Sequence, residues 1–218
     1  MRWSKNLAYL VGLMTTDGNL SQDGRHLSFV SKDLEQVENV IIILKLKNKI
    51  CVKNSSFKNN GKYYYVQFGD VEFYKFLNSV GLFPNKSKNL GALLIPETYI
   101  RDFLRGHLDG DGYTYSYWDK RWKNSFMFYT VFVSGSKKHV IWLRETILRL
   151  YKLEGKIKRN RSVYVLVFSK IASIKLMKVI YYGKNLICMK RKKFKISKAL
   201  GIIAGVQADV AELVYAQS

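Results

Sequence analysis

The feature of this sequence that most constrains its fold is an apolar segment ending in aspartate and glycine, which occurs twice. The first copy reads LVGLMTTDGNL and the second reads LRGHLDGDGYT. Each copy carries a glycine, Gly12 or Gly106, five residues before an aspartate, Asp17 or Asp111. A glycine within a helix costs about 1 kcal/mol relative to alanine, so its presence indicates a close approach by another backbone. We therefore expect two helices that pack together through these glycines and bring the two aspartates side by side.

The sequence around each motif predicts the same order of elements, αββαββα. In the first unit, periodicity and turn signals predict helices over 4–16, 34–47 and 71–80, with β-type sequence around SQDG that ends in LSFVSKD, and strands in KICVKNSS and KYYYVQF. In the second unit they predict helices over 96–108, 137–151 and 171–182 and strands in GYTYSYW, SFMFYTVFVSG, GKIKRN and SVYVLVF. Both prolines of the chain lie in the joining segment, LFPNKSKNLGALLIPETY. We predict an α+β protein with units at 1–88 and 89–205 and a tail, 206–218, outside the core.

The charge balance indicates a polyanionic partner. The chain carries 37 Lys and Arg against 16 Asp and Glu, a net charge of +21, and fold stability alone does not require such a self-repelling excess. Anionic membranes are disfavoured because no stretch approaches the roughly 20 apolar residues that span a bilayer. Nucleic acid is therefore the favoured partner.

The cysteine content and the first residues indicate an intracellular protein. Cys51 and Cys188 are the only cysteines, and neither has the Cys or His spacing of a zinc site. An early apolar run flows directly into the first motif and has no small-residue cleavage site. We expect no secretion, and a location in the cytoplasm, nucleoid or an organelle matrix.

The paired aspartates predict a metal site. Two neighbouring carboxylates repel each other unless a cation lies between them, and hard oxygen ligands suit Mg²⁺. We place this site at Asp17 and Asp111 with the glycines that follow them, Gly18 and Gly112, which let the chain leave each helix sharply. Metal held by carboxylates beside phosphates is the arrangement that hydrolyses phosphodiester bonds.

The two motifs, LVGLMTTDG and LRGHLDGDG, resemble the paired signatures of the LAGLIDADG homing endonucleases in their single-chain, two-motif form. The resemblance extends to about residue 200 through the order of elements, and Thr15 and His107 are departures outside the metal-binding positions. It implies a monomer in which two antiparallel sheets form a saddle on double-stranded DNA. It also implies an intron-encoded mobile element that cuts a long asymmetric target with Mg²⁺ and leaves 3′ overhangs, with Asp17 and Asp111 as catalytic metal ligands.

The saddle predicts which side chains contact DNA. If Val66 and Phe68, and in the second unit Val165 and Val167, face the core, alternate residues face the major groove. On the strands these contacts are Lys53, Tyr63, Tyr65 and Gln67, and in the second unit Asn160, Ser162, Tyr164 and Leu166. In the loops they are the phosphate contacts Arg25, Lys58, Lys62, Lys120, Arg121 and Lys123.

Basic residues near the carboxylates are candidates to assist catalysis. The resemblance places such a group after the second strand of each unit, on Lys32 and on Lys137, where it would polarise water or steady phosphate charge. The late cationic helix MKRKKFKISKAL fits either a backbone contact or a solvated face.

Two alternative functions remain open at this point. The family resemblance also allows an RNA-binding maturase, because proteins of that family can assist splicing of their host intron, and a net charge of +21 suits RNA equally well. The same fold also suits a regulator that binds DNA without cutting it, in which case the aspartates would be a relic.

Overall fold

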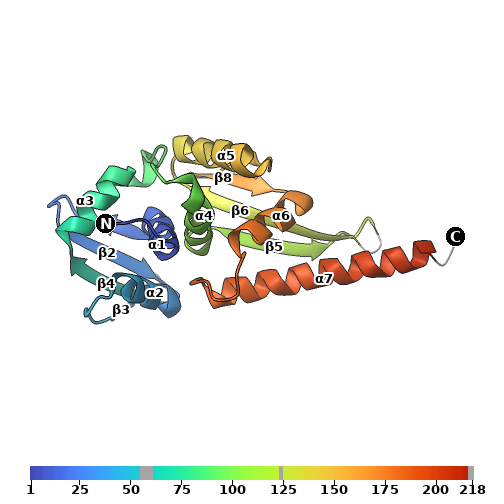
Figure 1. Cartoon of the computed structure of the whole chain (residues 1–218), viewed down its shortest axis with the longest axis horizontal. Helices are drawn as coiled ribbons and strands as arrows, with labels where there is room; N and C mark the ends of the chain where they lie inside the picture. Colours follow the sequence, from blue (N-terminus) through green and yellow to red (C-terminus); the bar gives the residue numbers. More distant parts are fainter. Residues whose placement is uncertain (55–60, 123–124, 216–218) are drawn as a thin grey trace.

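The chain folds into two units with the same order of elements, followed by a long helix (Figure 1). The computed structural model describes residues 1–54, 61–122 and 125–215, with side chains described as far as residue 206. The first unit comprises α1 (Lys5–Thr16), β1 (Gly18–Leu20), β2 (His26–Ser31), α2 (Leu34–Leu44), β3 (Cys51–Asn54), β4 (Lys62–Gly69) and α3 (Val71–Val80). The second comprises α4 (Ile100–Asp109), β5 (Tyr113–Trp118), β6 (Phe126–Ser134), α5 (Lys137–Tyr151), β7 (Lys156–Asn160), β8 (Val163–Phe168) and α6 (Lys170–Ile180). The predicted α+β class with two αββαββα units is confirmed.

Each unit contains one antiparallel sheet of four strands with the same topology. The strand orders are β1-β2-β4-β3 and β5-β6-β8-β7. The registers also correspond, because Ser31 pairs with Tyr64 in the first sheet and Ser134 pairs with Tyr164 in the second. The two halves are therefore equivalent strand by strand, although their sequences share few residues.

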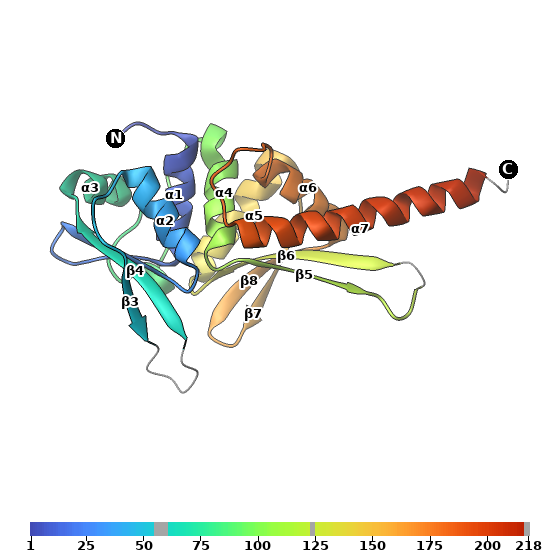
Figure 2. The same cartoon turned by 90° about the horizontal axis from the view of Figure 1, so that it is seen from below.

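The helices lie on one side of the two sheets, and the opposite side of the sheets is free of described helices (Figure 2). Helices α1 and α4 stand side by side between the units, and their residues form the centre of one continuous core. Strand alternation supplies the sheet side of this core, with Phe29 and Val66 from the first unit and Phe132 and Leu166 from the second. We call the helix-free side the open face.

Several element ends differ from the sequence prediction for identifiable reasons. Helix α2 ends at Leu44 instead of 47 because Lys45 adopts a left-handed conformation, with φ of 53°. The helix predicted from residue 96 begins with a short 3₁₀ turn, Glu97–Tyr99, before α4. Prolines favour such helix starts because their φ is already fixed.

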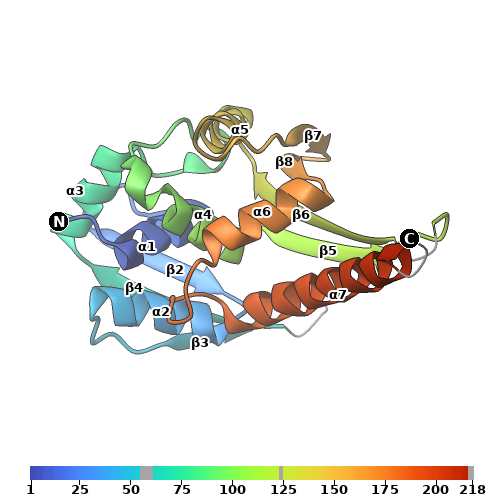
Figure 3. The same cartoon turned by 45° about the vertical axis from the view of Figure 1, so that its right-hand side comes forward.

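Helix α7 (Lys190–Tyr215) follows the second unit and lies alongside β5 (Figure 3). Its inner face buries Ile196, Ala199 and Ile203 at helical spacing. The helix continues past residue 205 without interruption, and the unit boundaries at 88 and 205 stay predictions. None of the helices in the described part of the chain is long and apolar enough to cross a membrane.

Candidate active site

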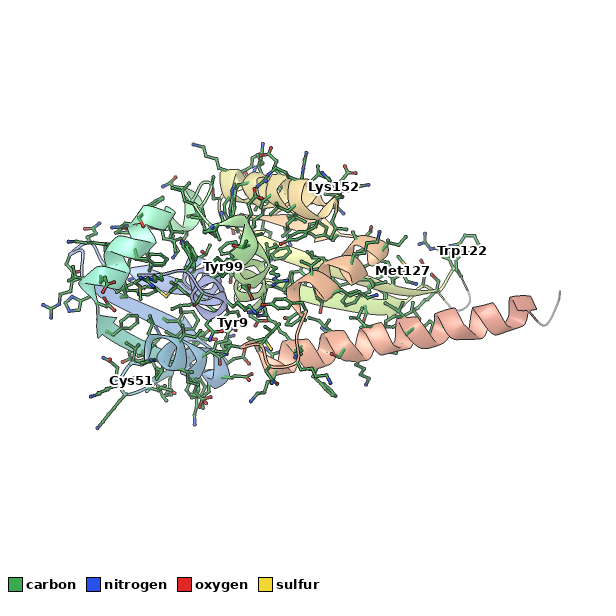
Figure 4. All side chains as sticks on the ribbon, viewed as in Figure 1. Tyr9, Cys51, Tyr99, Trp122, Met127 and Lys152 are labelled. Carbon is green, nitrogen blue, oxygen red and sulfur yellow. The ribbon has the colours of Figure 1, made fainter. Side chains whose placement is uncertain are left out.

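The two motif helices pack directly against each other at Gly12 and Gly106. A Cβ atom on Gly12 would lie 2.3 Å from the backbone oxygen of Phe103, and one on Gly106 would lie 2.0 Å from that of Tyr9. Either added atom would force the helices apart. The structure thus brings together the two glycines at which the sequence predicts close packing. Figure 4 labels Tyr9 at this crossing.

Asp17 and Asp111 lie at the adjoining ends of these helices. Asp17 caps the C-terminus of α1, and the chain after α4 passes so close that a Cβ on Gly110 would lie 2.8 Å from Asp17 Oδ2. Burial, and then the negative charge of Asp111, raise the pKa of Asp17 from 3.8 to about 6. Burial also raises the pKa of Asp111. A cation placed beside these carboxylates would stabilise their charged forms.

Two lysines that the sequence analysis did not select lie beside these carboxylates. Lys86, which is buried, donates a hydrogen bond from Nζ to the carbonyl oxygen of Gly18. Lys192 Nζ donates at 2.6 to 3.0 Å to the carbonyl oxygens of Leu108, Asp109, Gly110 and Gly112. Each lysine follows the last helix of its own unit and contacts the glycine after that unit's motif aspartate. The two lysines therefore occupy equivalent places in the two halves.

The site sets the charge of both lysines through opposing effects. Burial lowers the pKa of Lys86 from 10.5 to about 8, while the charges of Asp17 and Asp111 act in the opposite direction. Burial likewise lowers the pKa of Lys192, against the charges of Asp109 and Asp17. With a pKa of about 8, Lys86 is mostly protonated at pH 7. The centre therefore combines two carboxylates with ammonium groups held by backbone carbonyls.

The lysines predicted to assist catalysis lie farther out on the surface. Lys32 is exposed and lines a hollow together with Asp17, Tyr63 and Lys192. Lys137 is exposed and lines a separate hollow that contains neither motif aspartate. Lys32 thus shares a hollow with Asp17, whereas the hollow that Lys137 lines includes neither motif aspartate.

A third carboxylate, Asp109, is fully buried and has a structural role. Its oxygens accept hydrogen bonds from Tyr9 Oη at 2.9 Å, Tyr181 Oη at 3.0 Å and the backbone N–H of Met189 at 2.7 Å. Burial raises its pKa to about 6 despite these bonds. Asp109 therefore joins α1, α4 and the segment that leads into α7, and its oxygens are already used.

His107, which departs from the motif, belongs to a buried pair. Its Nε2 lies 3.2 Å from Nε2 of His139, and the rings stack with centroids 5.3 Å apart. His139 Nδ1 lies 2.9 Å from the carbonyl oxygen of Gly91. Burial lowers the pKa of both histidines, which makes them neutral at pH 7. The pair connects α4 to α5 within the second unit.

The strand residues predicted to contact DNA in the first unit lie on the open face. Val66 and Phe68 are buried, so Tyr63, Tyr65 and Gln67 point away from the helices. Two lysines lie over tyrosine rings on this face: Lys32 Nζ is 5.2 Å from the Tyr63 centroid, and Lys53 Nζ is 5.8 Å from that of Tyr65.

The prediction for the corresponding strand of the second unit is wrong by one residue. Leu166 and Phe168 are fully buried in the core, and Tyr164 packs against that core. Val163, Val165 and Val167 therefore face the open side, where Tyr164 and Leu166 were expected. The strand is apolar on both faces, so alternation alone could not set its register.

The remaining predicted contacts are distributed over strand ends and turns. Six of these predicted contacts are exposed in the described chain: Arg25, Lys62, Lys120, Arg121, Asn160 and Ser162. Arg121 is held by Asp119 through Nη2 at 2.7 Å and Nε at 3.0 Å, in an exposed turn. Lys58 and Lys123 lie outside the described residues.

Comparison with solved structures identifies the architecture. No protein-family model and no curated protein matches the sequence. The homing endonuclease I-WcaI bound to its DNA recognition sequence is similar with a TM-score of 0.64 and 16% identity, over 89% of this chain and 87% of that one. Full-length DUF199/WhiA from Thermatoga maritima is similar with a TM-score of 0.57 and 13% identity, over 97% of this chain and 70% of that one. A mesophilic variant of the homing endonuclease I-DmoI is similar with a TM-score of 0.54 and 17% identity, over 83% of this chain and 97% of that one. This chain has the LAGLIDADG fold. Structures of I-DmoI with DNA and Mn, and with DNA and Ca, are also similar.

The centre of this LAGLIDADG fold offers a sparse set of metal ligands. Within the described residues there is no group of three or more His, Cys, Asp or Glu side chains that could hold a metal ion. The donors are therefore Asp17 and Asp111, with the raised pKa values that a cation would reverse. Mg²⁺ is commonly held by one or two carboxylates, with water and substrate phosphates completing its octahedron. The residues present fit such an ion.

Proposed function

We propose that this protein is a metal-dependent, site-specific endonuclease that hydrolyses both strands of a DNA duplex. The observation that carries the proposal is the pair Asp17 and Asp111 at the helix crossing, where burial and then the negative charge of Asp111 raise the pKa of Asp17 to about 6. Such a pair costs stability unless it binds a cation, so its presence at the centre of a basic protein supports a catalytic role.

The proposed cofactor is Mg²⁺, held by the two aspartates at the site that also includes Gly18 and Gly112. The carbonyl oxygens of these glycines already accept hydrogen bonds from Lys86 and Lys192. When bound, the ion supplies an activated water and charge stabilisation at the phosphate. The similarity to I-DmoI, which was solved with DNA and Mn and with DNA and Ca, supports a divalent ion.

The chain's own lysines would act on the phosphate. Lys86 and Lys192 are held in place by backbone carbonyls, so their ammonium groups are oriented before substrate binds. Fixed positive charge beside a developing anion is a large catalytic effect, often about 10²-fold or more per group. Lys32, exposed in the same hollow as Asp17, would contact the phosphate or its water from the open side.

We expect Lys86→Met to lower the cleavage rate by about 10²-fold, with specific binding largely kept, because the variant loses a fixed charge at the phosphate. Lys137→Met serves as the matched control, since Lys137 is an exposed lysine in a hollow without either aspartate. Single-turnover cleavage and binding are measured together, with thermal melting as the check on folding. Equal rates for Lys86→Met and the unaltered protein would exclude the catalytic role.

The proposed substrate is a long asymmetric duplex lying across the open faces of both sheets. One chain supplies both motif helices, which supports a monomer, and two unlike sheets would read two unlike half-sites. The similarity to I-WcaI bound to its DNA recognition sequence supports this placement. We extend the proposal to 3′ overhangs and to an intron-encoded mobile gene as its origin.

Incubation with a library of random duplexes and Mg²⁺, followed by sequencing of the ends, tests the proposal directly. We expect one family of sites, cut on both strands with 3′ overhangs and dependent on a divalent ion. Recovery of uncut DNA only, under conditions where a selected site is bound, would contradict it.

That outcome would favour the second candidate, sequence-specific binding without cleavage. The similarity to WhiA covers 97% of this chain, so the fold is not confined to proteins named homing endonucleases.

A further inference from the structure

The open faces of the two sheets differ in chemistry. The first presents hydrogen-bonding side chains, among them Asn19, Ser28, Lys53 and Gln67, which the strand pairing places on the same face. On the second sheet the same pairing places a strip of valines there: Val131, Val133, Val163, Val165 and Val167. The two sheets therefore cannot read a base edge in the same way.

The valine strip is continuous across two strands. Val131 pairs with Val167 and Val133 with Val165. Val131 and Val165 are 1% and 7% exposed, although neither belongs to the core on the helix side. Their neighbours on the open face therefore cover them, which makes this part of the sheet an apolar floor.

Tyrosines of β5 and β6 border this apolar part of the sheet on the open face. Tyr115 stacks on Tyr129 at 4.8 Å and on Tyr117 at 6.5 Å, and Tyr113 pairs with Val131 at the strip's edge. The strip also approaches the candidate active site, because Val133 lines the same hollow as Asp111.

The surroundings of the floor favour a polyanion over a protein partner. Lys156 and Lys158 pair with Val167 and Val165, so they flank the strip on the outer strand. The described strand residues on this face of β5 to β8 include no aspartate or glutamate. An apolar floor beside cations fits the major groove, in which the methyl group of thymine is the apolar feature that a base presents.

We propose that the second sheet recognises its half of the target through the 5-methyl groups of thymine, near the scissile phosphates, whereas the first sheet reads hydrogen-bonding edges. This rests on the DNA-binding part of the proposed function and needs no cleavage. It identifies the partly exposed valines of the strip, Val133, Val163 and Val167, as specificity-determining residues and predicts a half-site richer in thymine on the side of the second unit.

Replacing thymine by deoxyuridine tests the proposal, because it removes only the methyl group and keeps base pairing. A site is first selected by binding from random duplexes without divalent metal, and the half read by the first sheet is identified as the one at which Gln67→Ala alters base preference. We expect each uracil in contact with the strip to weaken binding about fourfold, which is the effect of one buried methyl group. Uracil in the other half-site should change binding by less than about twofold on the same scale.

Val167→Thr provides the second measurement, because Val167 is a partly exposed valine of the strip and the change is nearly isosteric but adds a hydroxyl group. In this variant, the ratio of affinity for thymine to affinity for uracil should fall towards one at one position of the second half-site. The control Val30→Thr, on the open face of the first sheet, should leave that ratio unchanged. If uracil has the same effect in both half-sites, or if no second half-site is enriched, the proposal is overturned. Selection requires binding alone, so a protein that binds but does not cut would contradict the nuclease proposal and leave this test valid.

Discussion

At the scale of the residue, the properties of Asp17 follow from its position and not from its chemistry alone. An exposed aspartate such as Asp23 accepts hydrogen bonds from His26 and from the N–H of Arg25, and these hold its pKa below the usual range. Asp17 instead lies at a helix crossing beside Asp111, where burial and the second charge raise its pKa to about 6. The same residue type is therefore an ordinary turn residue in one place and, as we propose, a metal ligand in the other.

We predict that Asp17→Asn stabilises the metal-free protein at pH 8 by about 1–3 kcal/mol, because the amide removes a charge that the folded state disfavours. The folded protein binds the proton of the Asp17 carboxyl group more tightly than the unfolded chain does. The loss of folding stability that the charged Asp17 causes is therefore complete above its folded pKa of about 6. This destabilisation disappears as the pH falls from about 6 towards 3.8, the pKa of the unfolded chain. Denaturant unfolding in EDTA at pH 8 and pH 4.5 measures the gain.

Asp23→Asn is the control for this prediction, since its carboxylate is stabilised by hydrogen bonds and should show no gain at pH 8. Mg²⁺ should stabilise the unaltered protein and not Asp17→Asn. A gain that is the same at both pH values would show that charge is not the cause.

The sequence identified the two aspartates but not the two lysines that lie beside them. The aspartates repeat within a recognisable motif, whereas Lys86 and Lys192 come from unlike segments, NKSKN and MKRKK, at different distances from the motif. What the lysines share is their place after the last helix of each unit and their contact with Gly18 or Gly112. The position of these lysines beside the carboxylates therefore depends on the tertiary structure and cannot be seen in the sequence alone.

At the scale of the element, the fold depends on strand register and on the crossing of α1 and α4. The segment YYVQF alternates clearly, and its register was predicted, whereas YVLVF is apolar throughout and was predicted one residue out of place. Aligning the two segments makes Leu166 equivalent to Val66, and both residues are buried in the structure. Alignment of the two repeats therefore gives the correct register of the second strand, whereas alternation within that strand does not.

The crossing predicts a large cost for Gly12→Ala. The added Cβ would lie 2.3 Å from the backbone oxygen of Phe103, and a backbone atom cannot move aside without separating the helices. We expect a loss of about 3 kcal/mol or more in the free energy of unfolding. Gly201→Ala in α7 is the matched control, because no atom lies within 4 Å of its Cβ position. It should stabilise the protein by up to about 1 kcal/mol, and destabilisation of both variants alike would contradict the role of the crossing.

At the scale of the whole molecule, two equivalent units place their motif ends together at the centre and their open faces on one side (Figure 2). The sequence predicted this arrangement through the repeated order of elements. It did not predict that α7 would return to the centre, where Lys192 contacts the second motif and Arg191 Nη2 lies 3.0 Å from Asp33 in the first unit. One cationic helix thereby contacts both halves.

The net charge of +21 predicts strongly salt-dependent DNA binding. Neutralising six or more phosphates releases condensed counterions, so affinity should fall by about 10³-fold or more between about 50 and 200 mM salt. A titration of binding against salt concentration measures the slope. A nearly flat profile would contradict the polyanion-binding surface.

We propose that Asp17 and Asp111 together form the catalytic metal site, and cleavage of the selected target by Asp17→Asn and Asp111→Asn is the measurement that tests this assignment. Each amide keeps the shape of the side chain but loses the charge that retains the cation. In the proposed binding mode the open faces of the sheets read the bases, so binding should stay within about tenfold. We predict that each variant loses double-strand cleavage in Mg²⁺ while still binding the site. Full double-strand cleavage by either variant would show that these carboxylates only end helices and do not form the metal site.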